Sequence, residues 1–307
     1  MNKKFRFILV FVLIVSSYNN LNSYNFTGKD IISNCNIRAE VYKGFNSLYN
    51  FQFNRADSLR LELKRNYNYS PWTHLYEANY YWWKIISGEN NDENVECFYK
   101  ALTTARSKTG NIVTDEYQFL RIVIYSFMSR LDLMQSKYVN TLVELKKNLS
   151  VIKNTLGKET SFDGFYLTSG LYLYLTDVAY ENYIYLRPFL LFVPSGNREK
   201  GLSYLNFKHN DIILSTESKY FLMKIYDEVE KNHYKSLQYA TELAKSYPMN
   251  YIFKEHYLRM YCKKNNRSLT AEEIAAFKKE QLKNKQLSQK QTQYLLSIVQ
   301  KLQSKSS

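Results

Sequence analysis

The chain has 307 residues, and its 42 Lys and Arg against 28 Asp and Glu leave a formal net charge of +14. Nine Gly and four Pro are far too few for the many tight turns of a β-sandwich or a β-barrel, so we expect a helical protein with short connections. A basic balance is typical of proteins that bind nucleic acid, an anionic membrane surface or an acidic partner.

The N-terminus has the layout of a secretory signal. A basic start at residues 3–6 precedes an unbroken run of nine apolar residues from Phe7 to Val15. As a helix this run spans about 14 Å, too short to cross a bilayer of about 30 Å. We therefore expect residues 1–23 to be a signal peptide that is cleaved at Ser17 or Ser23, or else kept as an interfacial membrane anchor. The protein is then periplasmic or extracellular, which excludes nucleic acid as a partner.

The segment after the signal predicts helices that follow one another closely. Asn54 is a suitable N-cap for a helix that ends at Tyr67. Ser70 and Pro71 begin the next helix, because proline at the first helical position loses no hydrogen bond, and this helix stops at Gly88. A partner helix closes near Gly110, and further helices are expected from Thr114 and over 139–152, 162–187 with a break or loosening at Gly170, 197–209, 216–231, 233–247 and 250–262.

Two segments 180 residues apart share one pattern. Ala56 and Ser236 each stand in the first turn of an expected helix, and a tyrosine follows eleven positions later in both cases. A proline and a further aromatic-rich helix come next. Repetition of a helix–turn–helix unit predicts a solenoid, a class of protein that commonly serves binding.

These residues resemble the tetratricopeptide repeat (TPR) family, whose unit is two antiparallel helices in about 34 residues. Gly44 and Ala56 lie twelve positions apart, the family's spacing for the small residues that let paired helices approach closely. Residues 217–250 form a 34-residue block that contains Ser236 and carries Pro248 where the family prefers proline. The resemblance implies an all-α fold over residues 24–262, an α-α superhelix (solenoid) of antiparallel helix pairs.

A closer likeness is to exported bacterial TPR-like proteins to which no activity is assigned. It rests on the aromatic run from Tyr80 to Ile85, the stretch from Gly196 to Leu202 and the Tyr-Pro-x-Asn turn at 247–250. This likeness covers roughly residues 40–262. It implies a helical scaffold and supplies no catalytic residues to transfer.

The last part of the chain, residues 263–307, is different in character. It holds ten Lys and Arg against three Glu. A capping box at Thr270 to Glu273 begins one helix, and an apolar stripe from Leu287 to Leu302 marks another. We expect basic amphipathic C-terminal helices that cap the last repeat. The alternative is attachment to a membrane surface or to an anionic polymer.

Motifs that carry chemistry are absent from the sequence. There is no G-x-S-x-G, H-E-x-x-H, P-loop or G-x-G-x-x-G, so we expect no enzyme, no catalytic residue, no cofactor and no metal. The enzyme class that stays open is a cell-wall hydrolase on a helical scaffold, which would need a carboxylate in a deep cleft. Cys35, Cys97 and Cys262 form no C-x-x-C pair; they are either three isolated thiols or one disulfide with one thiol left over. Residues 195–198 predict a turn and a helix cap, with a cradle for a phosphate or carboxylate as the alternative.

Aromatic residues are the best candidates for a function. The chain has 29 Tyr, and tyrosine offers a large rigid contact surface together with a hydroxyl group. We therefore expect an exported TPR-like scaffold that binds a protein or peptide partner through an aromatic-rich concave face. The alternative is a periplasmic solute-capture or transporter-associated helical binding protein, in which a buried pocket collects the aromatic residues of 165–200 together with Arg187 and Arg198. The expected binding residues are Tyr81, Trp83, Tyr172, Tyr174, Tyr183, Arg187 and Arg198.

Overall fold

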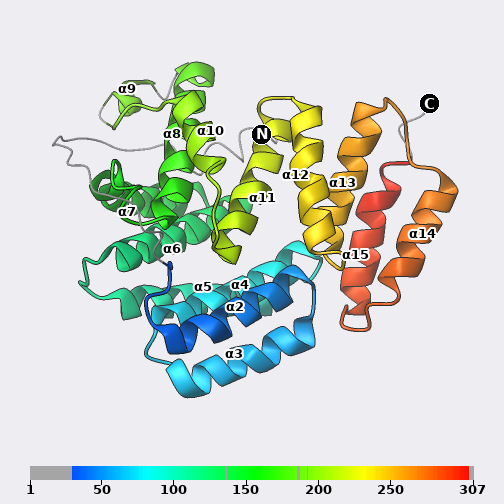
Figure 1. Cartoon of the computed structure of the whole chain (residues 1–307), viewed down its shortest axis with the longest axis horizontal. Helices are drawn as coiled ribbons and strands as arrows, with labels where there is room; N and C mark the ends of the chain where they lie inside the picture. The colour runs from blue at the N-terminus through cyan, green and yellow to red at the C-terminus, as the bar shows by residue number, and fades with distance from the viewer. Residues whose placement is uncertain (1–29, 136, 185–186, 192, 304–307) are drawn as a thin grey trace. The chain divides into compact units, whose positions relative to one another are not determined.

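The chain folds into helices throughout its described parts. A computed structural model describes residues 30–135, 137–184, 187–191 and 193–303, and all regular elements within these ranges are helices (Figure 1). Neighbouring helices pack in succession as antiparallel pairs, so the expected all-α fold of the helical-repeat solenoid type is confirmed. None of the described helices is both long and apolar enough to cross a membrane. The expected signal peptide at 1–23 lies outside the described residues.

The described chain divides into two compact units, each built from two stretches of sequence. Unit 1 consists of the described residues up to Cys35 together with Leu102–Ser218. Unit 2 consists of Asn36–Ala101 and Lys219–Ser307. The expected boundary between 262 and 263 stays a prediction.

Unit 1 is organised around one central helix. Helix α8 (Gly164–Asn182) packs against α6 (Asp115–Met134), α7 (Tyr138–Thr155), α9 (Arg187–Leu190) and α10 (Arg198–Leu205). Almost every residue of α8 up to Ala179 is buried, as expected for a helix that is flanked on several sides. The core of this unit contains Ile122, Leu149, Ile152, Tyr172 and Leu173.

The expected break at Gly170 is wrong, because α8 continues through that position. A Cβ atom added to Gly170 would lie 3.1 Å from the carbonyl oxygen of Gly201 and 3.0 Å from Leu205 Cγ. On α10, a Cβ atom added to Gly201 would lie 2.6 Å from the backbone nitrogen of Tyr174. The two glycines therefore serve the close approach of α8 and α10.

Unit 2 contains the N-terminal and the C-terminal helix pairs. Its N-terminal part holds α2 (Cys35–Tyr49), α3 (Phe53–Tyr67), α4 (Pro71–Ile86) and the first residues of α5 (Asp92–Thr109). Its C-terminal part holds the end of α11 (Ile212–Glu228), α12 (His233–Ser246), α13 (Tyr251–Lys264), α14 (Ala271–Gln281) and α15 (Gln289–Gln300). Helix α3 packs against α4, α12 against α13, and α15 against both α13 and α14.

The two parts of unit 2 share one aromatic core. The Tyr49 ring lies 5.2 Å from that of Tyr247, and the Trp83 ring lies 5.6 Å from that of Phe253. The buried Asn250 side chain donates a hydrogen bond to the carbonyl oxygen of Tyr49 at 3.0 Å. In a linear repeat array each repeat contacts only its neighbours, so these contacts across about 200 residues of sequence are an addition to the simple solenoid pattern.

Most of the predicted helix ends agree with the structure. The Ser70 hydroxyl accepts a hydrogen bond from the Trp72 amide at 3.3 Å, and Thr270 and Glu273 form the predicted capping box. Asn54 is not the N-cap of α3, which begins one residue earlier at Phe53. The reason is tertiary: the Asn54 amide donates to the side-chain oxygen of Gln286 at 2.9 Å, so a residue far along the chain satisfies this helix end.

Candidate functional site

A partly open polar cavity of about 330 Å³ lies within unit 2. We call it the Arg60–Tyr81 cleft. Helices α3 and α4 form its walls, the connection from α4 to α5 and the start of α5 form its rim, and α15 contributes one lysine. Its lining residues are Asp57, Arg60, Tyr80, Tyr81, Lys84, Glu89, Asn91, Glu93, Asn94 and Lys290.

Helical spacing places the charged residues of α3 on one face. Asp57, Arg60 and Lys64 are separated by three and four positions and therefore share one side of the helix. Arg60 Nε donates to Asp57 Oδ1 at 2.8 Å. Glu77 and Lys84 are seven positions apart, two helical turns, and therefore share one side of α4. The short connection between α3 and α4 brings these two charged sides together.

Glu77 is the buried anchor of these charges. Arg60 and Lys64 both donate to Glu77 Oε1 at 2.9 Å, and His74 Nδ1 lies 3.7 Å from Glu77 Oε2. Burial by itself raises the pKa of Glu77, but the nearby His74 ring and the hydrogen bonds from Lys64 and Arg60 outweigh it and bring the pKa to about 2. Glu77 is therefore ionised at neutral pH and holds Arg60 in place.

The guanidinium group of Arg60 lies against two tyrosine rings. Its Cζ atom is 5.4 Å from the Tyr80 ring centroid and 5.7 Å from the Tyr81 centroid, within the range of cation–π attraction. The two rings are nearly perpendicular, at 78°. Burial raises the pKa of Tyr80 to about 12 and also raises that of Tyr81, so both hydroxyl groups stay protonated.

The rim of the cleft carries charges of both signs. Lys84 Nζ pairs with Glu89 Oε2 at 3.1 Å, and the Asn94 side chain donates to the Glu89 carbonyl oxygen at 2.9 Å. Lys290 and Glu93 are exposed on opposite helices of the rim. A ligand that carries positive, negative and amide groups matches this rim. Its positive groups can pair with the glutamates, its negative groups with the lysines and its amide groups with polar side chains that are already held in position.

The expected binding residue Tyr81 lies in this cleft and is half-buried. Trp83, two positions further on, is only 4 % exposed. Its ring packs against Tyr49 at 5.9 Å, Phe51 at 5.8 Å and Phe253 at 5.6 Å. Trp83 therefore fills the core of unit 2 and does not line the cleft, so the structure gives no surface for its expected contact with a partner.

Tyr172 and Tyr174 are also core residues of unit 1, contrary to the expectation that they bind a partner. They are 1 % and 0 % exposed. The Tyr172 hydroxyl donates to the carbonyl oxygen of Pro194 at 2.6 Å. The backbone of Tyr174 faces Gly201 on α10. Their position on a helix flanked on several sides removes both rings from solvent.

Tyr183, Arg187 and Arg198 lie around the C-terminal end of α8. Tyr183 is the half-buried C-cap residue of this helix. Arg187 donates to the Tyr180 carbonyl oxygen at 2.9 Å and covers the Tyr180 ring, while Arg198 pairs with Glu181 at 3.1 Å. Both arginines therefore have partners within unit 1.

The alternative anion cradle at residues 195–198 is occupied by the chain's own groups. Asp177 Oδ2 accepts from the Arg198 amide at 3.1 Å, and Asn197 Oδ1 accepts from the Lys200 amide at 2.8 Å. A carboxylate at a helix N-terminus is the favourable arrangement that an external anion would otherwise supply. The segment is the turn and cap that we expected first, with Asn197 as the N-cap of α10.

The four expected repeat-packing residues occupy contact positions in unit 2. A Cβ atom on Gly44 would lie 2.6 Å from the Tyr76 ring, and the Tyr76 hydroxyl donates to the Ala56 carbonyl oxygen at 2.8 Å. The buried Ser236 hydroxyl donates to the Met223 carbonyl oxygen on α11 at 2.8 Å. Pro248 is exposed in the turn from α12 to α13, which the Asn250 amide closes on the Tyr247 carbonyl oxygen at 3.0 Å.

A second charged cluster in unit 2 joins α11 to α13. Asp227 is 2 % exposed, accepts from Lys263 at 2.6 Å and pairs with Arg259. Arg259 also donates to Glu255 Oε1 at 3.0 Å. Burial raises the pKa of Glu255, although Arg259 acts in the opposite direction. The contacts of Asp227 join α11 to α13, and the Arg259–Glu255 pair lies within α13. All of these charges are paired with one another inside unit 2, so we regard the cluster as structural.

Metal and thiol chemistry receive no support from the described residues. No group of three or more His, Cys, Asp or Glu in them could hold a metal ion. No disulfide joins the described cysteines, of which Cys35 is exposed, Cys97 half-buried and Cys262 buried. The Cys97 thiol lies near Tyr81 and, after burial, helps to raise the pKa of the Tyr81 hydroxyl.

Sequence reasoning missed most of the cleft. It selected Tyr81 but not Arg60, Glu77 or Lys84. The available signal was the spacing of Asp57, Arg60 and the other charged residues on two helices predicted to be adjacent. The contribution of Lys290 had no local signal, because α15 is about 200 residues away in sequence.

No protein-family model and no curated protein matches the sequence, and no solved structure matches the chain.

Proposed function

We propose that the protein is an exported TPR-like scaffold that binds an extended segment of a protein or peptide partner, and that the Arg60–Tyr81 cleft is its contact site. The described fold supports a scaffold, since it consists of packed helix pairs. The N-terminal sequence supports export. The resemblance to the TPR family supports recognition of a protein partner.

The observation that carries the proposal is the guanidinium group of Arg60 held between two tyrosine rings at the wall of an open cavity. Tyrosine and arginine are enriched among the residues that dominate protein interfaces. Glu77 fixes Arg60 before any partner arrives, so little side-chain freedom is lost on binding. Amide and charged groups of a peptide then meet side chains that are already positioned.

A photo-crosslinking experiment in intact cells tests this proposal. A benzophenone amino acid at position 81 is expected to capture one main partner. The same amino acid at position 234 is the control, because Tyr234 is 57 % exposed on α12 of the same unit but lies outside the cleft lining. The proposal is overturned if both positions give the same products.

Binding of the captured partner, once purified, supplies the quantitative test. Tyr81→Ala is expected to weaken binding about tenfold or more, the effect usual for central interface residues. Lys290→Glu reverses a charge on the rim of the cleft and is expected to weaken binding by a smaller, severalfold factor. Tyr234→Ala is expected to leave binding unchanged. Circular dichroism and thermal unfolding establish that each variant is folded before its affinity is compared.

A solute-capture protein is the second candidate function, and the volume of the cleft favours it. About 330 Å³ suits a polar solute of the size of a few amino-acid residues. A library of polar solutes, zwitterions and short peptides, screened by thermal shift, separates the two functions. A single small solute that raises the melting temperature of the wild type, but not of Lys290→Glu, would favour solute capture.

A further inference from the structure

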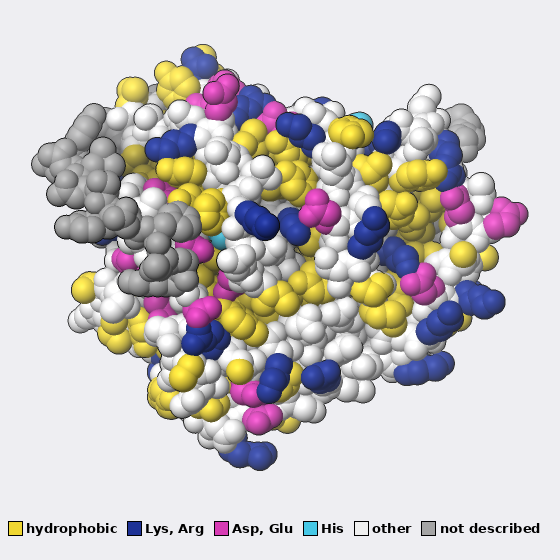
Figure 2. Space-filling model, in the orientation of Figure 1, with side chains coloured by type: hydrophobic (Ala, Val, Ile, Leu, Met, Phe, Trp, Pro, Cys, Tyr) yellow, Lys and Arg dark blue, Asp and Glu magenta, His cyan; other side chains and the backbone are white. Residues whose placement is uncertain are grey.

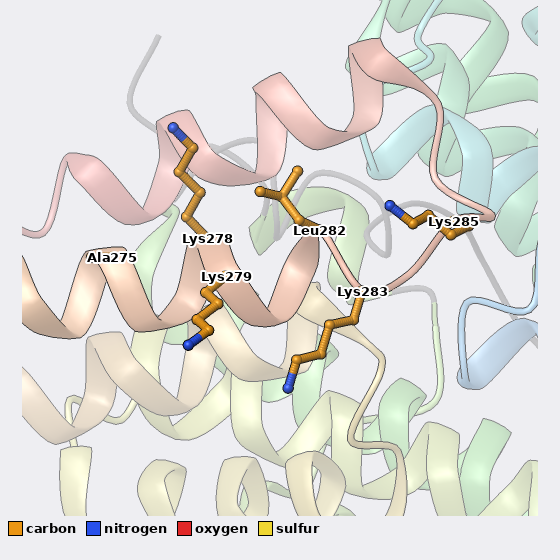
Figure 3. A pocket seen from close by; sticks show the side chains of 6 residues that line it. All are labelled: Ala275, Lys278, Lys279, Leu282, Lys283 and Lys285. Atoms are coloured by element: carbon orange, nitrogen blue, oxygen red, sulfur yellow. The ribbon is translucent and has the colours of Figure 1, made fainter.

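A second surface of unit 2 carries lysines in place of mixed charges. Lys278, Lys279, Lys283 and Lys285 lie around Leu282 on α14 and the turn that follows it (Figure 3). With Ala275 they line a shallow hollow of about 500 Å³. We call this surface the α14 lysine face. Figure 2 shows Lys and Arg side chains where α14 is drawn, with others spread over the same face.

The positive charge of this face is not neutralised within the described chain. The nearby acidic residues have other partners: Glu280 pairs with Lys254, and Glu273 pairs with Arg267 at 2.7 Å. No carboxylate of the described residues lies within 4 Å of the ammonium groups of the four lysines. Four like charges within eight residues repel one another, so an external anion is stabilising here.

An exposed apolar side chain stands at the centre of the face. Leu282 is 52 % exposed, while Ile274 and Phe277 on the other side of α14 are buried. One side of α14 is therefore apolar and packs in the core, while on its outer side Leu282 is an exposed apolar side chain surrounded by lysines. Lysines around an exposed leucine are the composition of surfaces that lie in the interface of a bilayer.

The directions of the lysines distinguish between two kinds of anion. The ammonium groups of Lys278 and Lys279 extend to opposite sides of α14, and those of Lys283 and Lys285 also point apart (Figure 3). Groups that converge on one point suit a compact anion such as a single phosphate. Groups that spread around an apolar centre suit anions that are spread over a plane.

We propose that the α14 lysine face docks the protein on a membrane surface rich in anionic phospholipid, with the lysines on the phosphate groups and Leu282 entering the interface. This docking is independent of the cleft. The face and the Arg60–Tyr81 cleft share no lining residue. A scaffold held at a membrane in this way keeps its partner-binding cleft available.

Vesicle flotation of the full chain tests the proposal. The vesicles are phosphatidylcholine alone, or an equimolar mixture with phosphatidylglycerol. The wild type is expected to float more with the anionic than with the neutral vesicles, and high salt, which screens charge, is expected to remove this difference. The variant with Lys278, Lys279, Lys283 and Lys285 all changed to Gln is expected to bind several hundredfold more weakly, since each lysine at an anionic surface contributes about a fivefold factor.

A matched control removes the same charge elsewhere. It changes Lys108, Lys158, Lys208 and Lys245 to Gln; these lysines are exposed and scattered over the chain. The control is expected to float with the anionic vesicles within a fewfold of the wild type, and Leu282→Ser is expected to bind severalfold more weakly. Every variant keeps Phe7 to Val15, so differences among variants report the lysine face.

Three results would overturn the proposal. One is equal binding of the wild type to neutral and anionic vesicles. Another is equal loss of binding in the lysine-face variant and the scattered control. The third is a lysine-dependent affinity for soluble poly-glutamate without binding to the anionic vesicles, which would assign the face to an acidic polymer.

Discussion

Changing Glu77 to Gln removes the charge that organises the Arg60–Tyr81 cleft and keeps the shape of the side chain. The pKa of Glu77 is lowered from 4.5 to about 2 in the folded protein. The difference of about 2.5 units corresponds to about 3.4 kcal/mol of folding free energy at neutral pH, at about 1.36 kcal/mol per unit. Lys64 is partly exposed, so screening by water and salt reduces this value, and we expect a loss of about 2–3 kcal/mol.

The dependence on pH follows from the sign of the shift. A carboxyl group with a lowered pKa contributes its full stabilisation above the unfolded-state pKa and loses it as the pH falls through the folded-state pKa. The difference in stability between the wild type and Glu77→Gln is therefore largest above pH 5 or so. It falls to about 1 kcal/mol near pH 3 and almost disappears near pH 2.

Urea unfolding followed by circular dichroism at pH 7, 4 and 3 measures this difference. Glu62→Gln is the matched control, because Glu62 is exposed on α3, and we expect it to change stability by less than about 0.5 kcal/mol. The reasoning is refuted if Glu77→Gln behaves like Glu62→Gln, or if its deficit is the same at pH 3 and pH 7.

Three further predictions concern packing and burial. Gly44→Ala is expected to lower the free energy of unfolding by about 1–3 kcal/mol, because the new methyl group would lie 2.6 Å from the Tyr76 ring. Asn46→Ala, at an exposed position on the same helix, is the control. Equal urea midpoints for the two variants would contradict the packing role of Gly44. Asn250→Asp keeps an acceptor for the Ile252 and Phe253 amides but cannot donate to the Tyr49 carbonyl oxygen. The free energy of unfolding of this variant is expected to be lower by about 2 kcal/mol or more, and wild-type stability would refute the role of the Asn250–Tyr49 hydrogen bond. His209 is buried with no hydrogen-bond partner among the described residues, and burial lowers its pKa to about 4. As the pH falls, the unfolded chain therefore binds a proton at this histidine before the folded chain does. The wild type is expected to lose about 3 kcal/mol of its free energy of unfolding between pH 7 and pH 4. In urea unfolding, His209→Phe should lack this part of the loss, and a pH profile identical to that of the wild type would show that His209 does not titrate as described.

Local sequence patterns predicted the helices well. The caps at Ser70 and Thr270 and the stops at Gly88 and Gly110 depend on hydrogen bonds and dihedral angles within a few residues. Asn54 shows where such reasoning ends. The side chain of Gln286, 232 positions away, accepts the hydrogen bond of the Asn54 amide, and no sequence pattern near Asn54 predicts this contact.

The candidate site was predicted only in part, for a related reason. Tyr81 and Trp83 are two positions apart in one aromatic run, but one lines the cleft and the other is in the core. Composition and spacing cannot separate them, because the distinction depends on which helices cover each side of α4. Tyr172 and Tyr174 were misplaced in the same way, since α8 is covered on several sides.

The sequence by itself determined that this chain is helical, where most of its helices begin and end, and that its C-terminal part is basic, because these properties depend on neighbours along the chain and on composition. Only the tertiary structure decided that the N-terminal and C-terminal helix pairs of unit 2 share one core, and that a buried Glu77 holds Arg60 against Tyr80 and Tyr81. It also decided that four lysines on α14 and the turn after it have no described carboxylate beside them. The physical reason is that burial and charge pairing are properties of contacts between segments far apart in sequence, and the same residue types occur on both the covered and the open faces of each helix.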